Sequence, residues 1–140
     1  MYKNFKKFSP RAPVRTFRDL EVYQKTMEAS VVIFKNLRPK LNILKYVFTE
    51  NLVQCSMTIP LYISEAHSLR FGDHKKGILL LENAMAGCNK MVVYLEQAKG
   101  VYGSKLDQDL VDELVKRYVD TRGKIFRLEK SWQKFTPPEK

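Results

Sequence analysis

The chain has 140 residues, with 25 Lys and Arg against 15 Asp and Glu, for a formal net charge of +10. This length suits one domain, and an apolar fraction of 44% is ordinary for a globular protein, so the charge does not imply disorder. No apolar run is long enough to predict a transmembrane helix, and none follows the basic N-terminus as a secretory signal would require. We therefore expect a cytoplasmic protein whose charge selects an anionic partner, most commonly nucleic acid.

The first 15 residues form a basic leader that contains Pro10 and Pro13. We expect residues 1–15 to be a flexible arm, residues 16–135 to be one helical domain and residues 136–140 to be a short tail. Cys55 and Cys88 are too few for a disulfide framework or a zinc cluster, and we interpret both as reduced core residues.

Residues from about Thr16 to Leu37 predict the first helix, which Pro39 should end. Apolar residues recur at heptad spacing, with a second set three or four positions away. The two sets are Leu20, Met27 and Phe34, and Tyr23, Ser30 and Leu37.

The second helix is predicted from about Tyr46 to Leu69. Pro60 lies inside it, where it removes a backbone donor and favours a kink. The alternative is a break between Thr58 and Leu61. The expected apolar stripe is Phe48, Leu52, Cys55, Ile59, Ile63 and Ala66.

The third helix is predicted from about His74 to Lys99, with Asp73 as its N-cap and Gly100 and Gly103 at its end. Its apolar face is Leu81, Ala84, Met85, Cys88, Met91, Val92 and Leu95.

The fourth helix is predicted from about Leu106 to Phe135, and Pro137 and Pro138 stop it. Long helices with short links predict an all-α fold, an antiparallel four-helix bundle with up-down-up-down topology. The stripe of the fourth helix is Leu110, Leu114, Tyr118, Ile125, Leu128 and Trp132.

Basic residues gather opposite that last stripe. At 100° per residue one arc holds most of them, and Arg70, Lys75 and Lys76 add charge of the same sign. A solvated face is the plainer interpretation, but only Asp120 and Glu129 oppose these charges, which favours nucleic-acid contact. Lys and Arg at this spacing follow phosphates and do not read bases. The arc contains Lys116, Lys124, Arg127, Lys130 and Lys134, with Arg117 beside them.

Arg122 is expected on the apolar side of the same helix, among Val111, Val115 and Tyr118. A buried Arg needs a partner. It could snorkel to solvent, pair with an acidic residue of the chain such as Glu65 or Glu82, or face a subunit contact or the lumen of a barrel.

No pattern predicts catalysis. His67 and His74, with Glu65 nearby, lack the ligand spacing of the helical metal motifs. The chain has neither a phosphate-binding loop nor a nucleophile elbow. We therefore predict no catalytic, cofactor-binding or metal-binding residues, and a protein that is not an enzyme.

Three segments carry a resemblance to a known family. Residues Thr58–Ala66 resemble the Ser-Ile-Pro-x-x-Ile-x-Glu-Gly signature of the four-helix-bundle family known from rRNA intervening sequences, with Thr and Ala replacing the first and last residues. Residues Phe17–Lys25 are similar to the first helix of that family. Residues Ala84–Gly87 resemble its Ala-x-Gly-Ser stretch, with Cys88 where Ser is usual. The similarity spans nearly all of residues 16–134.

The same family includes the accessory variability determinants of diversity-generating retroelements. Those proteins resemble this chain in being small basic bundles, and they form pentameric barrels, bind nucleic acid and associate with a reverse transcriptase. Asn89 and Lys90 stand where the intervening-sequence branch usually has Glu, which favours the accessory branch and adds Lys90 to the candidate phosphate contacts. The resemblance implies RNA or DNA, the reverse transcriptase and four further copies of the chain as partners.

Two alternatives stay open: an rRNA intervening-sequence type of protein with an undefined role, and a bundle that binds an acidic protein. Apolar residues off the stripes predict burial between identical subunits, which suits a ring. They are Val47, Leu61, Val93, Val119 and Phe126.

Overall fold

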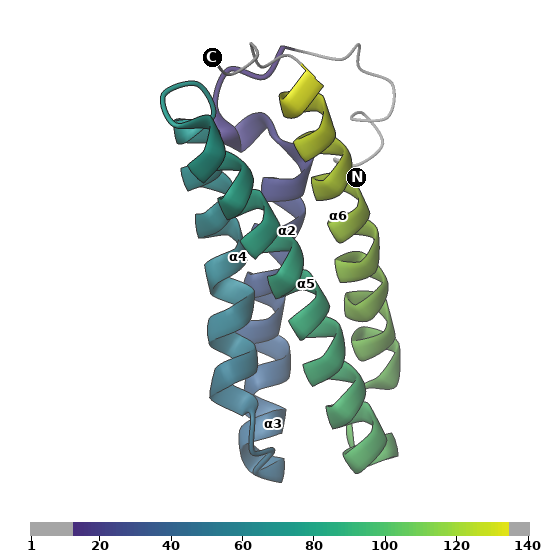
Figure 1. Ribbon diagram of the computed structural model, residues 1–140. Helices are drawn as coiled ribbons and strands as arrows, with labels where there is room; N and C mark the ends of the chain where they lie inside the picture. The colour runs from purple at the N-terminus through teal and green to yellow at the C-terminus, as the bar shows by residue number, and fades with distance from the viewer. Residues whose placement is uncertain (1–12, 135–140) are drawn as a thin grey trace.

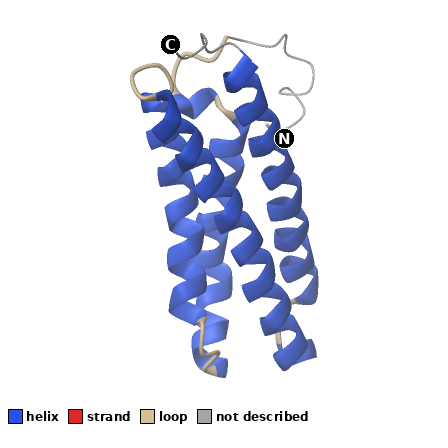
Figure 2. Ribbon diagram, viewed as in Figure 1, coloured by secondary structure: helices blue, strands red, loops and turns tan. Residues whose placement is uncertain are grey.

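The structure is a computed structural model that describes residues 13–134. The predicted arm, up to residue 12, and the predicted tail lie outside the described residues. Within residues 13–134 the chain is helical and contains no strand (Figure 2). The predicted all-α class and a helical bundle are therefore confirmed.

Four rods of helix make up the bundle (Figure 1). A short 3-10 turn leads into the first rod, which has three consecutive parts, and a second 3-10 turn joins the last two rods. The elements are η1 (Phe17–Asp19), α2 (Glu21–Val32), η2 (Ile33–Leu37), α3 (Arg38–Leu44), α4 (Thr49–Leu69), α5 (His74–Tyr102), η3 (Gly103–Lys105) and α6 (Gln108–Lys134).

The first rod does not end at Pro39, so that prediction is wrong. It runs on through the π-helix η2 into α3, and it stops at Lys45, which adopts the left-handed conformation with φ 62°. The wide turn of η2 comes directly before the proline, where an ordinary helical turn would press the ring against an earlier carbonyl. A π-helix thus lets the rod pass a residue that usually ends one.

The heptad pattern of this rod was also misread. Met27 and Phe34 are 40% and 42% exposed, although the periodicity placed both in the core. Thr26 and Ala29, which the heptad sets did not include, are buried beside Ser30, which they did include. Thr26 and Ser30 satisfy their hydroxyls by donating to the carbonyls of Val22 and Met27 at 2.9 and 2.7 Å. The buried residues of the rod are Val22, Thr26, Ala29, Ser30, Ile33, Leu37 and Leu41.

The helix α4 passes through Pro60 without interruption, so the alternative of a break between Thr58 and Leu61 is wrong. Pro60 is itself buried. The helix begins at Thr49, later than predicted, and Tyr46 lies in the preceding turn with its hydroxyl donating to the carbonyl of Tyr94 at 3.0 Å. Of the predicted stripe, Leu52, Ile59, Ile63 and Ala66 are fully buried, Cys55 is half-buried and Phe48 is exposed.

Asp73 caps α5 as predicted, since its carboxylate accepts from the backbone N–H of Lys76 at 3.2 Å. Gly100 does not end the helix, which continues to Tyr102 and stops at Gly103 with φ 54°. Together α5 and η3 are long and apolar enough, by length and composition alone, to cross a membrane. Because α5 contacts both α4 and α6 and contributes much of the core, it has the character of a core helix, which meets the same criteria.

The two helices α4 and α5 lie in close contact at Gly87. A Cβ atom there would lie 2.8 Å from Cγ1 of Ile59, a fully buried side chain. Residue 87 and Ile59 belong to two of the segments that carry the family resemblance, and the fold brings these segments together. The contact therefore requires a residue without a side chain.

Gly87→Ala should lower the free energy of unfolding by about 1–3 kcal/mol, because Ile59 must move within a filled core. The matched control is Gly100→Ala, where no atom lies within 4 Å of the added Cβ. That change should be neutral or stabilising by about 0.5–1 kcal/mol through helix propensity. Urea unfolding of both variants measures the difference, and equal stabilities would contradict the close contact.

Candidate nucleic-acid interface

The helix α6 separates apolar from basic side chains as its sequence predicts. Tyr118 and Ile125 are fully buried. Burial raises the pKa of Tyr118 far above its ordinary value, so this phenol stays neutral. On the opposite side, Lys116, Arg127, Lys130 and Lys134 are exposed.

Two of the predicted phosphate contacts are engaged within the chain. The Nζ atom of Lys124 lies 2.6 Å from Oε2 of Glu21, and a guanidinium nitrogen of Arg117 lies 2.6 Å from Oε1 of Glu28. Both pairs join α6 to α2, and both cations are only partly exposed. Their charge is therefore largely balanced, and they are weaker candidates for phosphate contact than Lys116, Arg127 and Lys130.

Charge is unevenly distributed along α6. Residues 108–120 carry the acidic side chains Asp109, Asp112, Glu113 and Asp120 against Lys116 and Arg117. Residues 121–134 carry five basic side chains against one acid, Glu129, which is buried. The positive charge of the helix thus lies toward its C-terminal end.

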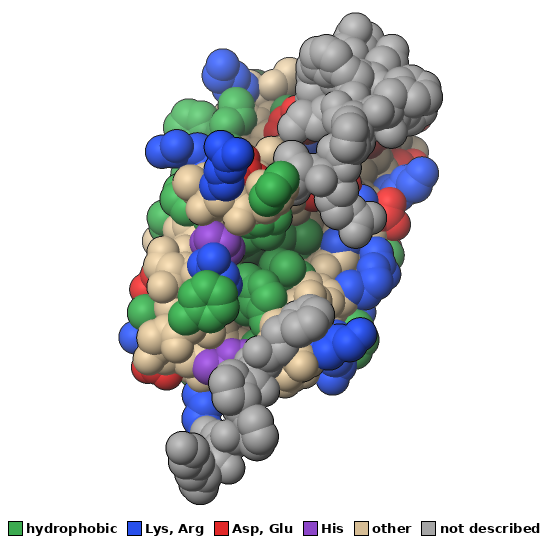
Figure 3. All heavy atoms as spheres, turned by 90° about the horizontal axis from the view of Figure 1, so that it is seen from above, with side chains coloured by type: hydrophobic (Ala, Val, Ile, Leu, Met, Phe, Trp, Pro, Cys, Tyr) green, Lys and Arg blue, Asp and Glu red, His purple; other side chains and the backbone are tan. Residues whose placement is uncertain are grey.

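That end of α6 lies beside residues 13–20 and the turn between α4 and α5, at the upper end in Figure 1. Seen from above, Lys and Arg side chains stand around the rim of this end, with hydrophobic and His side chains between them and some Asp and Glu side chains at its edge (Figure 3). Segments far apart in the sequence therefore form one cationic surface, which we call the basic end. Its members are Arg15, Arg18, Arg70, Lys75, Lys76, Arg127, Lys130 and Lys134.

Arg70 is held in place within the basic end. Its guanidinium donates to the carbonyl of His67 at 2.5 Å and lies 4.4 Å above the ring centre of Phe71. Phe71 is 86% exposed. An exposed ring stacked on a guanidinium is a surface on which a base can stack. No motif in the sequence singles out Phe71.

The two histidines do not form a metal site. His67 is buried and its ring lies 6.3 Å from that of Trp132. Burial lowers the pKa of His67, Arg70 lowers it further, and Asp19 opposes both, so the imidazole favours its neutral form. Among residues 13–134, no group of three or more His, Cys, Asp or Glu side chains could hold a metal ion.

Arg122 is exposed, which agrees with the alternative that it snorkels to solvent and not with a buried, paired arginine. It lies at the margin of the buried face, where a long side chain reaches water. Glu129, two turns further along the same side, is buried and was not identified. Burial raises the pKa of Glu129, the charge of Glu82 and a hydrogen bond between the two carboxyls raise it further, and Lys130 lowers it. The raised pKa favours the neutral form of Glu129 over the charged form.

Lys90 lies apart from the basic end. It is exposed in a groove between α4 and α5, beside Cys55. Burial raises the pKa of the Cys55 thiol, partly offset by Lys90, and burial raises that of Cys88 to about 12. Neither thiol is a ready nucleophile, because both favour the protonated form at neutral pH.

Comparison of the chain with protein families, with curated proteins and with solved structures finds no match. The geometry of the described residues and the resemblance of the three sequence segments are therefore what support a function.

Glu129→Gln should raise the melting temperature near neutral pH, because it removes a carboxyl that folding disfavours in its charged form. A carboxyl with a raised pKa in the folded state destabilises once the pH exceeds its unfolded pKa, so the difference should shrink as the pH falls to about 4. Thermal unfolding across this range measures it. Glu113→Gln, an exposed site on α6, is the control and should keep the pH profile of the parent.

Proposed function

We propose that this protein is a non-enzymatic nucleic-acid-binding accessory protein of a diversity-generating retroelement. It binds template RNA or its cDNA through phosphate contacts and associates with the reverse transcriptase. The observation that carries the proposal is the basic end, where exposed Lys and Arg from three separate segments gather while Glu129, the nearby acid of α6, is buried.

Phosphate binding suits this surface physically. Arg127 and Lys130 project from successive turns of α6, and Lys76 stands at the first turn of α5. Each neutralised phosphate releases condensed counterions, so affinity falls steeply as salt rises. Long flexible cations without a reading helix in a groove contact the backbone and give little sequence preference.

The reverse transcriptase as partner, and a ring of five copies, rest on the family resemblance. Exposed apolar side chains support assembly: Leu61 and Val31 on α4 and α2 are 63% and 42% exposed, and Val93 and Val119 on α5 and α6 are 53% and 52% exposed. The first pair of helices and the second are opposite sides of the bundle. Two unlike apolar sides favour head-to-tail contacts, which form a ring when the rotation between neighbouring copies closes.

The finer topology proposed with this function is antiparallel and up-down-up-down. Cross-helix ion pairs support it. Moving forward along α2 from Glu21 to Glu28, the partner moves backward along α6 from Lys124 to Arg117. Lys99, near the end of α5, pairs with Asp112, near the start of α6, at 2.6 Å.

Replacing Lys76, Arg127 and Lys130 together with Gln should weaken binding to mixed-sequence RNA and DNA. The slope of the logarithm of the binding constant against the logarithm of the salt concentration should become shallower by about 2–3. All three are exposed, so each change should alter stability by about 0.5 kcal/mol or less. Titrations at several salt concentrations measure this.

The control variant for that titration removes the same charge from the other end of the bundle, at Lys35, Lys40 and Lys105, which are also exposed. It should retain nearly the affinity of the parent. Equal losses of affinity in both variants would show that binding depends on the net charge of the protein and not on the basic end. No binding of the parent at low salt would contradict the proposed function and favour an acidic protein partner.

The purified protein should sediment or scatter as a homo-oligomer, with a pentamer as the expected species. The physical reason is burial of the apolar side chains that one copy leaves exposed on opposite sides. Leu61→Glu and Val119→Glu should each dissociate it, because each places a charge at the proposed contact. A mass near 16.4 kDa that does not change on concentration would contradict the ring.

A further inference from the structure

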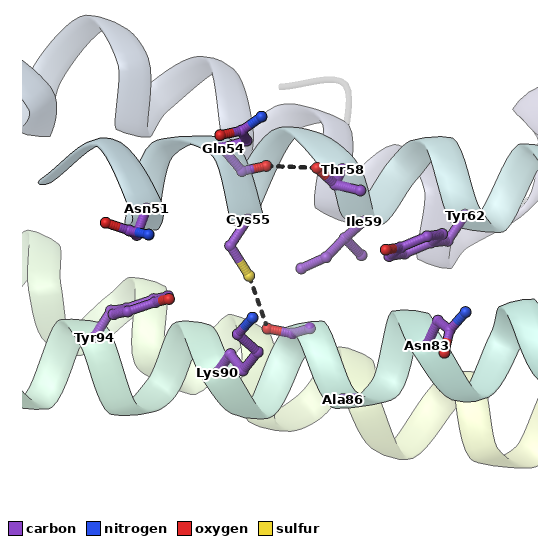
Figure 4. Close-up of a pocket in the computed structure, with 11 residues that line it drawn as sticks. Asn51, Gln54, Cys55, Thr58, Ile59, Tyr62, Asn83, Ala86, Lys90 and Tyr94 are labelled. Atoms are coloured by element: carbon purple, nitrogen blue, oxygen red, sulfur yellow. Dashed lines mark hydrogen bonds between the residues drawn. The ribbon is translucent and has the colours of Figure 1, made fainter. Parts of the chain in front are cut away.

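A polar groove runs between α4 and α5, on the side away from the core (Figure 4). It is open to solvent and encloses about 490 Å³, within the range of small-ligand sites. Along each helix it extends over twelve residues, from Asn51 to Tyr62 and from Asn83 to Tyr94, and the eleven steps between the end residues span about 16 Å of helix. The shape is therefore a trough and not a round pocket.

The close contact at Gly87 produces the trough. Ile59 and Gly87 touch at its floor, and the neighbouring Ala86 adds little bulk. Two polar side chains of α4 are hydrogen-bonded to backbone carbonyls. The Thr58 hydroxyl donates to the carbonyl of Gln54 at 2.7 Å, and the Cys55 thiol donates to the carbonyl of Gly87 at 3.5 Å. The space above the floor stays open because no large side chain occupies it.

The trough selects an anion. Lys90 stands at its middle and is the one ionised side chain among the lining residues, which include no Asp or Glu. Within residues 13–134, the Lys90 ammonium has neither an ion pair nor a hydrogen bond. A cation without a counter-charge in a polar trough favours a phosphate or another anionic group.

The two ends of the trough repeat the same pair of groups. At one end the ring of Tyr62 from α4 faces Asn83 from α5, and at the other the ring of Tyr94 from α5 faces Asn51 from α4 (Figure 4). The Tyr94 ring is held against Phe48, 5.7 Å away between centroids. A flat ring beside a carboxamide is suited to one nucleobase, because the ring stacks and the carboxamide both donates and accepts.

We propose that this trough binds two consecutive unpaired nucleotides of single-stranded nucleic acid. The linking phosphate contacts Nζ of Lys90, and the two bases stack on Tyr62 and Tyr94 with their edges toward Asn83 and Asn51. The inference rests on the proposed function and deepens it, because it gives the protein a preference for single strands. Paired bases are excluded, since their faces are stacked within the duplex and cannot enter a trough between helices.

The test compares a short single-stranded RNA with the same strand annealed into a duplex, on the full chain. Tyr62→Ala should weaken binding of the single strand about tenfold or more, as expected for the loss of one stacked base, and leave duplex binding unchanged. Tyr62→Phe keeps the ring and should bind like the parent. Lys90→Gln, at an exposed site, should weaken the single strand without affecting folding.

The rate at which iodoacetamide alkylates Cys55 at raised pH reports on occupancy of the trough, because the other thiol, Cys88, is fully buried. The single strand should slow the reaction and the duplex should not. Single-strand binding that survives both Tyr62→Ala and Lys90→Gln would overturn the trough and leave the basic end intact as the phosphate surface. Adenosine monophosphate that binds as tightly as the strand would also overturn it, in favour of a free-nucleotide site. If neither nucleic acid binds the parent, the proposed function itself fails.

Discussion

The contact between α4 and α5 at Gly87 is the constraint on which the rest of the architecture depends. Ile59 occupies the space that any side chain at residue 87 would need, so the two helices pack closely there. A second close approach lies further along, where a Cβ at Gly77 would be 3.2 Å from the carbonyl oxygen of Ala66. Two such contacts fix how α4 and α5 cross. The crossing in turn sets the shape of the trough between them and the position of the turn that carries Lys75 and Lys76.

Electrostatics then divides the surface that this framework presents. Ion pairs to Glu21 and Glu28 hold α6 against α2 and engage two of its cations. Apart from Lys116, the remaining cations of α6 lie toward its C-terminal end, where burial raises the pKa of the Glu129 carboxyl. Positive charge of this kind attracts a polyanion over a distance of about one Debye length, whereas the trough acts only on contact. Under the proposed function, the basic end attracts the phosphate backbone and the trough contacts the bases.

Much of the fold could be predicted from the sequence because helix periodicity and capping are local. The stripes of α4, α5 and α6 place Leu52, Leu81 and Ile125 in the core, and Asp73 caps its helix as expected. Pro39 was misjudged because a π-helix relieves the clash that usually ends a helix at proline. Met27 and Phe34 were misplaced because several faces of a helix can satisfy a heptad count when its apolar residues are spread around it.

The sequence by itself determined that the chain is all-helical and basic, and which faces of three helices lie in the core. It also determined the net positive charge that a partner encounters. Only the tertiary structure decided which charges pair and which groups are buried. Arg122 and Glu129 lie on the same side of α6, yet one reaches water and the other is enclosed beside Glu82. The trough likewise exists only because Asn51 and Tyr94, far apart in the chain, come together across two helices. Periodicity shows which face a residue occupies, but its neighbours across helices depend on how closely the helices pack.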